Sequence, residues 1–292
     1  MPQILSLSDA VAAHVADGHS VALEGFTHLI PFAAAHEIIR QGRRDLTLIR
    51  MTPDVIYDQM IGMDCVRRLV FSYAGNPGAG LLRRMRDAVE NGWPGPLELE
   101  EHSHAAMATA YEAGAAGLPF GVLRGYRGAD LGEVNPNIRA VTCPFTGEEL
   151  AAVPALKPDV AVIHAQKADR SGNVLIEGIV GVQKEAVLAA GAAIVTFEEM
   201  VDDLRGLSDG AGPHPNACVI PGWCVDALCH VPGGAHPSYA AGYYPRDNAA
   251  YLAWDRIAAD RDLFRRWMDE HVIGAGPGAF AERAPFTQEI AA

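Results

Sequence analysis

The sequence is poor in lysine and has no long hydrophobic run. Its 23 basic residues include only three lysines, and 36 acidic residues give a formal net charge of −13 at pH 7. Contacts with nucleic-acid phosphates or an anionic membrane surface need a basic face, which this charge balance disfavours. No apolar run reaches the roughly 18–20 residues of a membrane-spanning helix. We therefore expect neither nucleic acid nor a membrane as a partner.

Cysteine is also scarce. The five cysteines are odd in number and follow no spacing pattern, which favours a reduced, cytoplasmic location over a disulfide framework. The first residues lack the basic region and apolar core of a signal peptide, which agrees with that expectation. Cys224, Cys229 and His230 lie close together without the paired spacing of a zinc site, so we expect no metal centre.

Several motifs of common enzyme classes are missing. There is no phosphate-binding loop of the form G-x-x-x-x-G-K-[ST], no G-x-G-x-x-G after a strand, and no H-E-x-x-H helix. These absences disfavour a nucleotide-driven enzyme, a dinucleotide oxidoreductase and a zinc protease. We also expect no permanently bound cofactor.

The pattern that is present alternates short β-branched runs with longer helical stretches. It predicts an α/β fold with a mainly parallel sheet flanked by helices. We expect one domain over residues 1–292, with a C-terminal helical segment from about residue 246. Expected strands lie at 20–23, 45–50, 66–73, 97–100, 159–165, 174–176 and 193–197, and expected helices at 31–40, 81–91, 103–116 and 184–190.

Ligands of such sheets bind beyond the carboxyl ends of the strands. The loops at 24–28, 51–54, 72–76 and 101–104 all follow expected strands, so we expect them to converge at one edge of the sheet. They carry the candidate site residues.

The first candidate group is Glu24-Gly25-Phe26. A glycine between a strand and a helix lets the backbone approach a ligand, and nearby amides can face an anion or oxyanion. An ordinary tight turn is the alternative. The same two interpretations apply to Ser72, Gly75 and Asn76 in the loop after the third strand, where small and amide side chains suit either substrate contact or a turn.

The second group is Glu101-His102-Ser103-His104, at the start of a predicted helix. Two histidines beside a carboxylate form a plausible acid–base cluster. For Ser103 the pattern favours an N-cap of the helix over a role in chemistry. For Glu101, a favourable interaction with the positive helix end is the structural alternative.

These pieces, in this order, resemble the A (α) subunits of family I coenzyme A-transferases, and especially that of glutaconate CoA-transferase. The similarity extends from about Leu7 to His271. The clearest matching stretches are residues 21–26, 72–76, 118–120, 164–173, 222–227 and 234–238.

The resemblance implies the CoA-transferase (sugar-isomerase-like) fold and a ping-pong reaction with acyl-CoA thioesters as substrates. In this reaction a glutamate of the B subunit first attacks the acyl-CoA and then carries the CoA as a glutamyl thioester. No such glutamate follows the expected strand at 45–50, whose end reads Met51-Thr52-Pro53-Asp54, and Glu112-Ala113-Gly114 lies within an expected helix. We therefore expect a partner B subunit to supply the nucleophile.

Two residues depart from the pattern of the family. Glu24 stands where the family has the first glycine of a Gly-Gly-Phe loop, and it faces either solvent or a substrate contact. His104 aligns where the transferases carry Gln and where a hydrolytic branch, which opens rings of CoA-linked steroid fragments, carries Glu. Histidine can donate a hydrogen bond as Gln does or move a proton as Glu does.

The expected function is therefore CoA transfer to a small carboxylic acid, glutaconate-like or a 3-oxo acid. The alternative is the A subunit of a CoA-ester ring-opening hydrolase. A non-catalytic effector-binding module on the same fold is disfavoured because no helix-turn-helix is evident. The predicted catalytic residue is His104, supported by Ser103. The predicted substrate or oxyanion contacts are Glu24, Gly25, Phe26, Ser72, Gly75, Asn76 and Glu101.

Overall fold

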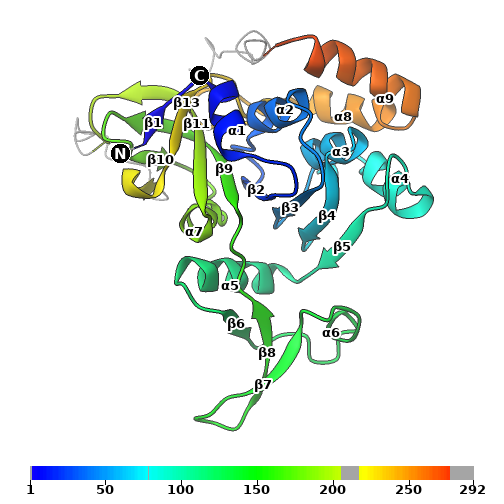
Figure 1. Ribbon diagram of the computed structural model, residues 1–292, viewed down its shortest axis with the longest axis vertical. Helices are drawn as coiled ribbons and strands as arrows, with labels where there is room; N and C mark the ends of the chain where they lie inside the picture. Colours follow the sequence, from blue (N-terminus) through cyan, green and yellow to red (C-terminus); the bar gives the residue numbers. More distant parts are fainter. Residues whose placement is uncertain (1, 78, 205–216, 277–292) are drawn as a thin grey trace, which may run out of the picture.

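The computed structural model describes residues 2–77, 79–204 and 217–276 of the chain, which are built around one large sheet (Figure 1). The ten strands of this sheet are β1 (Gln3–Ile4), β2 (Ser20–Glu24), β3 (Leu46–Arg50), β4 (Val66–Phe71), β5 (Glu98–Glu101), β9 (Val160–Asp169), β10 (Val174–Ile176), β11 (Ala192–Val201), β12 (Cys218–Ile220) and β13 (Ala227–His230). Along the sheet they follow the order β1-β13-β11-β9-β2-β3-β4-β5, and all neighbours on this path are parallel. β10 pairs antiparallel with β9 and β12. The expected α/β fold with a mainly parallel sheet is confirmed.

Helices cover both faces of the sheet. They are α1 (Leu7–His14), α2 (Phe32–Arg40), α3 (Val55–Gly62), α4 (Arg83–Asn91), α5 (His104–Ala115), α7 (Gln183–Ala189), α8 (Asn248–Ile257) and α9 (Arg261–Met268), whereas the short helix α6 (Leu131–Val134) packs beside the smaller sheet described below. Residues of α1, α2, α3, α8 and α9 form one core with the sheet, and α5 and α7 form the other. Alternate residues of β9 enter the two cores: Val160 and Val162 the first, Ala161 and Ile163 the second. Burial on both faces explains the continuous apolar run of this strand.

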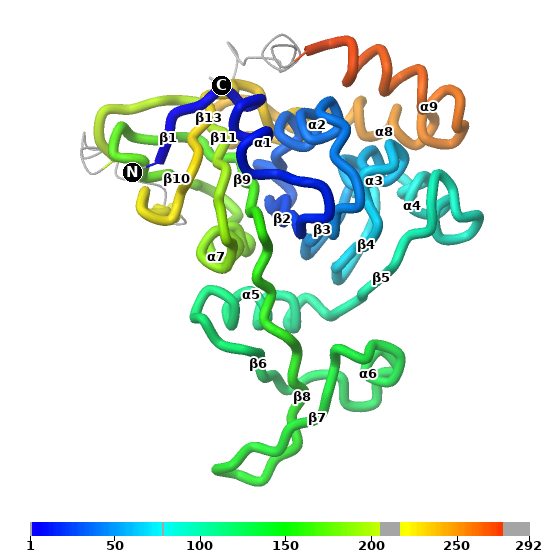
Figure 2. The backbone as a smooth tube through the Cα atoms, in the orientation of Figure 1, coloured from blue at the N-terminus to red at the C-terminus, as the bar shows by residue number. Residues whose placement is uncertain are grey.

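A smaller sheet lies on the far side of α5 from the large one. Its strands are β6 (Phe120–Leu123), β7 (Arg139–Thr142) and β8 (Glu149–Pro154), in the antiparallel order β6-β8-β7. In Figure 2 this unit extends away from the body of the molecule. Its inner face packs on Ala106 and Ala110 of α5 through Ala151 and Val153. No strand was expected over this region, where the strands are four to six residues long and largely exposed.

All eleven expected elements are present, with ends shifted by a few residues. The strand expected at 159–165 continues to Asp169, and the helix expected at 103–116 spans His104–Ala115. Helix α3 was missed because all eight of its residues are buried, so no polar face marks a helical period. Helices α8 and α9 occupy the region from about residue 246 where a helical segment was expected. The division of the chain into domains stays a prediction.

Two kinds of feature are absent from the described residues. None of their helices is long and apolar enough to span a membrane. Nor do three or more His, Cys, Asp or Glu side chains of this part of the chain gather as metal ligands.

Candidate functional site

Four neighbouring parallel strands, β2, β3, β4 and β5, end at the same edge of the sheet, and hydrogen bonds connect the segments that follow them. The N–H of Met51 donates to Oε1 of Glu24 at 3.1 Å. The carbonyl oxygen of Met51 accepts from the Ser72 hydroxyl at 2.6 Å, and Ser72 Oγ lies 3.1 Å from His104 Nδ1. The expected convergence of these strand ends is confirmed.

Glu24, at the end of β2, is only 2% exposed and therefore faces the interior rather than solvent. Its Oε1 accepts from the hydroxyl of Tyr111, a buried residue of α5, at 2.8 Å and from the Met51 N–H. Burial raises the pKa of Glu24 to about 7, although the charge of Arg50 and both hydrogen bonds act in the opposite direction. This carboxyl group consequently titrates near neutral pH.

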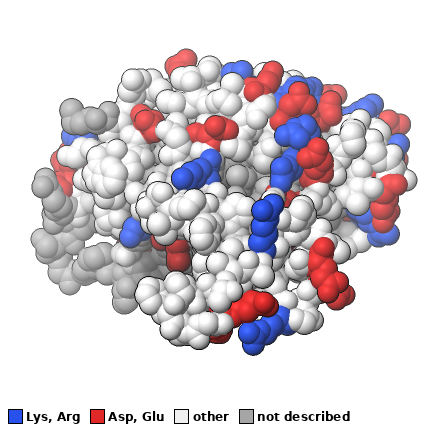
Figure 3. Space-filling view, turned by 60° about the horizontal axis from the view of Figure 1, so that its bottom comes forward, with Lys and Arg blue, Asp and Glu red and all other residues white. Residues whose placement is uncertain are grey.

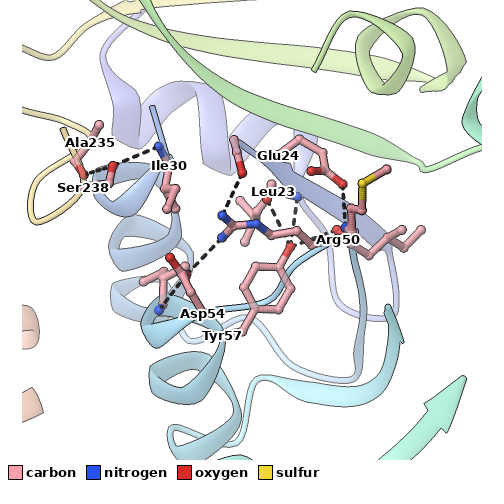
Figure 4. A network of polar contacts seen from close by, with 12 residues as sticks. Leu23, Glu24, Ile30, Arg50, Asp54, Tyr57, Ala235 and Ser238 are labelled. Atoms are coloured by element: carbon pink, nitrogen blue, oxygen red, sulfur yellow. Dashed lines mark hydrogen bonds and ion pairs between the residues drawn. The ribbon is translucent and has the colours of Figure 1, made fainter. Parts of the chain in front are cut away.

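Arg50, at the end of β3, holds the loop that follows β2 (Figure 4). Its side chain is 1% exposed and forms an ion pair with Asp54 at 3.0 Å. It also donates to the carbonyl oxygen of Gly25 at 2.8 Å. Asp54 in turn caps α3 by accepting from the N–H of Ile56. A guanidinium and two carboxyl groups therefore lie buried together behind the predicted site.

Gly25 occupies a position where a side chain does not fit. An added Cβ would come within 2.6 Å of the Leu29 carbonyl oxygen and 2.9 Å of that of His28. The turn is tight because Thr27 and Leu29 both adopt positive φ angles, of 64° and 51°. The side chain of Phe26 is half-buried against the core that contains α7. The glycine is thus explained by packing, and a contact of Gly25 or Phe26 with substrate stays a prediction.

Ser72 and His104 are the two predicted residues whose side chains meet. His104 is the first residue of α5, its side chain is exposed, and its distance to Ser72 joins residues 32 positions apart in the chain. His102, two residues earlier, instead contacts the Glu100 carboxylate, which lies 2.8 Å from its Nε2. Of the two histidines in the expected acid–base cluster, His104 is therefore the one whose side chain contacts a residue of the converging loops.

Ser103 and Glu101 have structural roles at the same helix end. The Ser103 hydroxyl accepts from the N–H of Ala106 at 3.2 Å, which is the N-cap interaction favoured by the sequence. The Glu101 side chain is exposed, and its carbonyl oxygen accepts from Asn135 at 2.7 Å. Catalytic support by Ser103 and substrate contact by Glu101 stay predictions.

Asn76 and Gly75 are both buried beyond the end of β4. The amide nitrogen of Asn76 donates to the carbonyl oxygen of Tyr251 in α8 at 2.9 Å, so this side chain ties the loop to a C-terminal helix. A Cβ on Gly75 would come within 2.6 Å of the Tyr73 hydroxyl. Neither observation brings the two residues into contact with His104.

The structure adds two residues that sequence reasoning missed, Tyr111 and Arg50. Tyr111 contacts Glu24 across 87 positions of the chain and Arg50 contacts Gly25 across 25, so no local pattern marks either. The face in Figure 3 shows acidic and basic side chains interspersed among the residues drawn in colour, without a broad basic patch.

Relatives of known name cover nearly the whole chain. It is 62% identical over 274 residues to the A subunit of the 3-oxoadipate CoA-transferase of Pseudomonas knackmussii, covering 94% of this chain and 95% of that one. It is 33% identical to the A subunit of the glutaconate CoA-transferase of Acidaminococcus fermentans, covering 94% of this chain and 88% of the relative. The IpdA subunit of a cholesterol ring-cleaving hydrolase of Mycobacterium tuberculosis is 26% identical, with 94% of each chain covered.

A solved structure and a family signature agree with these relatives. The crystal structure of glutaconate coenzyme A-transferase from Acidaminococcus fermentans superimposes with a TM-score of 0.84 at 33% identity, covering 93% of this chain and 89% of that chain. The signature of the Coenzyme A transferase family matches residues 4–230. With this fold and these relatives, the chain belongs to the coenzyme A transferase family and is the A subunit of a CoA-transferase.

Proposed function

We propose that this protein, together with a B subunit, transfers CoA from an acyl-CoA to a small 3-oxo dicarboxylic acid of the 3-oxoadipate type. The observation that carries this proposal is the 62% identity to the A subunit of 3-oxoadipate CoA-transferase over 94% of the chain. The lower identity of 33% to the glutaconate enzyme supports the 3-oxo acid over glutaconate as the acceptor.

The proposed reaction runs through a glutamate of the partner subunit. Its carboxylate oxygen attacks the thioester carbonyl, the C–S bond breaks, and an acyl-glutamyl anhydride forms with release of the CoA thiolate. The thiolate then attacks the glutamyl carbonyl, which frees the first acid and leaves a glutamyl-CoA thioester. The acceptor acid regenerates the carboxylate by the reverse steps. Covalent catalysis thus divides one difficult exchange into easier steps.

The end of β3 supports the assignment of this nucleophile to the partner. Asp54, the first acidic residue after that strand in the sequence, is 2% exposed, pairs with Arg50 and caps α3. Glu24 is buried beneath the Met51 peptide, and Glu112 lies within α5. None of these three carboxyl groups is both exposed and placed in a loop.

Trapping of the thioester tests this proposal. The co-expressed subunits are incubated with succinyl-CoA, treated with borohydride, and both chains are digested and analysed by mass spectrometry. We expect a reduced glutamate on the partner chain and none on this chain. A reduced glutamate on this chain would refute the two-subunit mechanism. CoA transfer to glutaconate that is faster than transfer to 3-oxoadipate would refute the proposed acceptor.

A CoA-ester hydrolase is the second candidate, and His104 is the observation that favours it. The imidazole is exposed and hydrogen-bonded to Ser72, where it is able to take a proton from water. The match to a ring-cleaving hydrolase subunit shows that such chemistry occurs among proteins similar to this one. Release of free CoA without any acceptor acid, at a rate equal to that of transfer, would favour this candidate.

A further inference from the structure

The hydrogen bonds around Ser72 determine which nitrogen of His104 carries a proton. Ser72 Oγ lies 2.6 Å from the carbonyl oxygen of Met51 and 3.1 Å from His104 Nδ1. A serine hydroxyl has one proton to donate, and a carbonyl oxygen only accepts. If the Ser72 proton pointed to His104, two oxygen lone pairs would face each other across 2.6 Å. The proton therefore lies between Ser72 and Met51.

Ser72 then presents only lone pairs to His104, so Nδ1 of the imidazole must be the donor. A neutral imidazole carries one N–H, and the other nitrogen is an acceptor. Within the described part of the chain, the contact with Ser72 is the only hydrogen bond of this imidazole. The proton on Nδ1 consequently leaves Nε2 with a lone pair, to which no described residue donates a hydrogen bond.

The backbone of Met51, whose carbonyl oxygen imposes this arrangement, is itself held through both of its polar groups. Its carbonyl oxygen also accepts from the N–H groups of Ser72 and Tyr73, at 3.2 and 3.3 Å. Its N–H donates to Glu24, whose carboxyl group accepts from Tyr111. Tyr111 belongs to the same helix, α5, that begins with His104. Three donors thus hold the carbonyl oxygen beside Ser72, and the preceding peptide group is anchored to α5 through Glu24 and Tyr111.

We infer that Ser72 is a positioning residue that fixes neutral His104 in its Nδ1–H tautomer and leaves Nε2 as a proton acceptor at the active site. Neutral His104 then accepts a hydrogen bond or a proton from an O–H group, such as that of water or an enol. It does not donate to an acyl oxygen, as a glutamine amide would. The inferred tautomer is independent of the proposed function, whereas its consequence for turnover rests on that function.

The tautomer is directly measurable. The full chain is labelled with ¹⁵N-histidine, and two-bond ¹H–¹⁵N correlation spectra are recorded without substrate, at a pH where His104 is neutral. The signals of His104 are identified by their loss in His104→Asn. We expect the Nδ1–H pattern in the wild-type protein and in Ser72→Thr, which keeps the hydroxyl. In Ser72→Ala we expect a shift towards the Nε2–H form, which free histidine prefers. An Nε2–H pattern in the wild type, or an unchanged Nδ1–H pattern in Ser72→Ala, would overturn the inference.

The consequence for turnover is tested in the complex with the B subunit. A wrong tautomer disables a catalytic histidine, so Ser72→Ala is expected to lower kcat roughly tenfold or more. Ser72→Thr is expected to retain most of the rate. If the spectra show a changed tautomer in Ser72→Ala but its kcat equals that of the wild type, the positioning role is refuted. The proposed transfer reaction is not affected by that result. Failure of the proposed function is recognised separately, by a partner chain that forms no glutamyl thioester.

Discussion

The buried carboxyl group of Glu24 is expected to make the stability of this protein fall as the pH rises. The pKa of Glu24 is raised from 4.5 to about 7, chiefly by burial. Between these values the unfolded chain releases a proton that the native state keeps, so the free energy of unfolding declines with increasing pH. Since one pKa unit corresponds to about 1.4 kcal/mol, a rise of this size is worth about 3 kcal/mol.

The substitution Glu24→Gln removes this titration and keeps the main contacts. Both the Met51 N–H and the Tyr111 hydroxyl donate to Oε1, and an amide oxygen is able to accept both. We expect the stability of Glu24→Gln relative to wild type to improve by up to about 3 kcal/mol between pH 5 and pH 8. Any constant cost of the amide group cancels in this comparison. Burial also raises the pKa of Asp58 to about 6. This second titration is common to both proteins, so it cancels in the difference between their stabilities.

Urea unfolding followed by circular dichroism, at half-unit steps from pH 5 to pH 8.5, measures this difference. Glu112→Gln is the matched control, because it removes one carboxyl group from an exposed position of α5. Its stability relative to wild type is expected to stay constant over the same range. Parallel stability curves for wild type and Glu24→Gln would refute the assignment of a titrating, buried carboxyl group.

Three further substitutions test the elements around the site. Gly114→Ala places a Cβ 1.9 Å from the carbonyl oxygen of Leu156, and we expect it to prevent stable folding or to lower the melting temperature markedly in thermal unfolding. Gly25→Ala meets the Leu29 carbonyl oxygen at 2.6 Å, and we expect a loss of about 1–3 kcal/mol in urea unfolding together with reduced CoA transfer. Ser103→Ala removes the N-cap of α5, and we expect a loss of about 1 kcal/mol in urea unfolding, most of it restored by Ser103→Asn. Wild-type stability in any of these variants would contradict the corresponding packing or capping contact.

The sequence by itself predicted the parallel strands whose ends form the site, although not helix α3, which follows one of them. The buried run at 159–165 and its shorter counterparts indicate parallel strands covered on both faces, and such strands end at a common edge. Ser103 was identified as an N-cap because its hydroxyl acts on a neighbour three residues away, within reach of a local pattern. Similarly, Glu112-Ala113-Gly114 was assigned to a helix, where Gly114 now packs against Leu156.

Only the tertiary structure decided what the polar side chains at this edge contact. The sequence allows the Glu24 side chain to face either solvent or substrate, whereas in the structure it turns inward and contacts Tyr111. Asn76 was a candidate substrate contact, and its amide donates to α8. The physical reason is that hydrophobic periodicity reports whether a position is buried, whereas the partner of a buried polar group lies tens of residues away along the chain. The contact between Ser72 and His104 is likewise not predictable from local sequence, because it requires the ends of β4 and β5 to lie side by side.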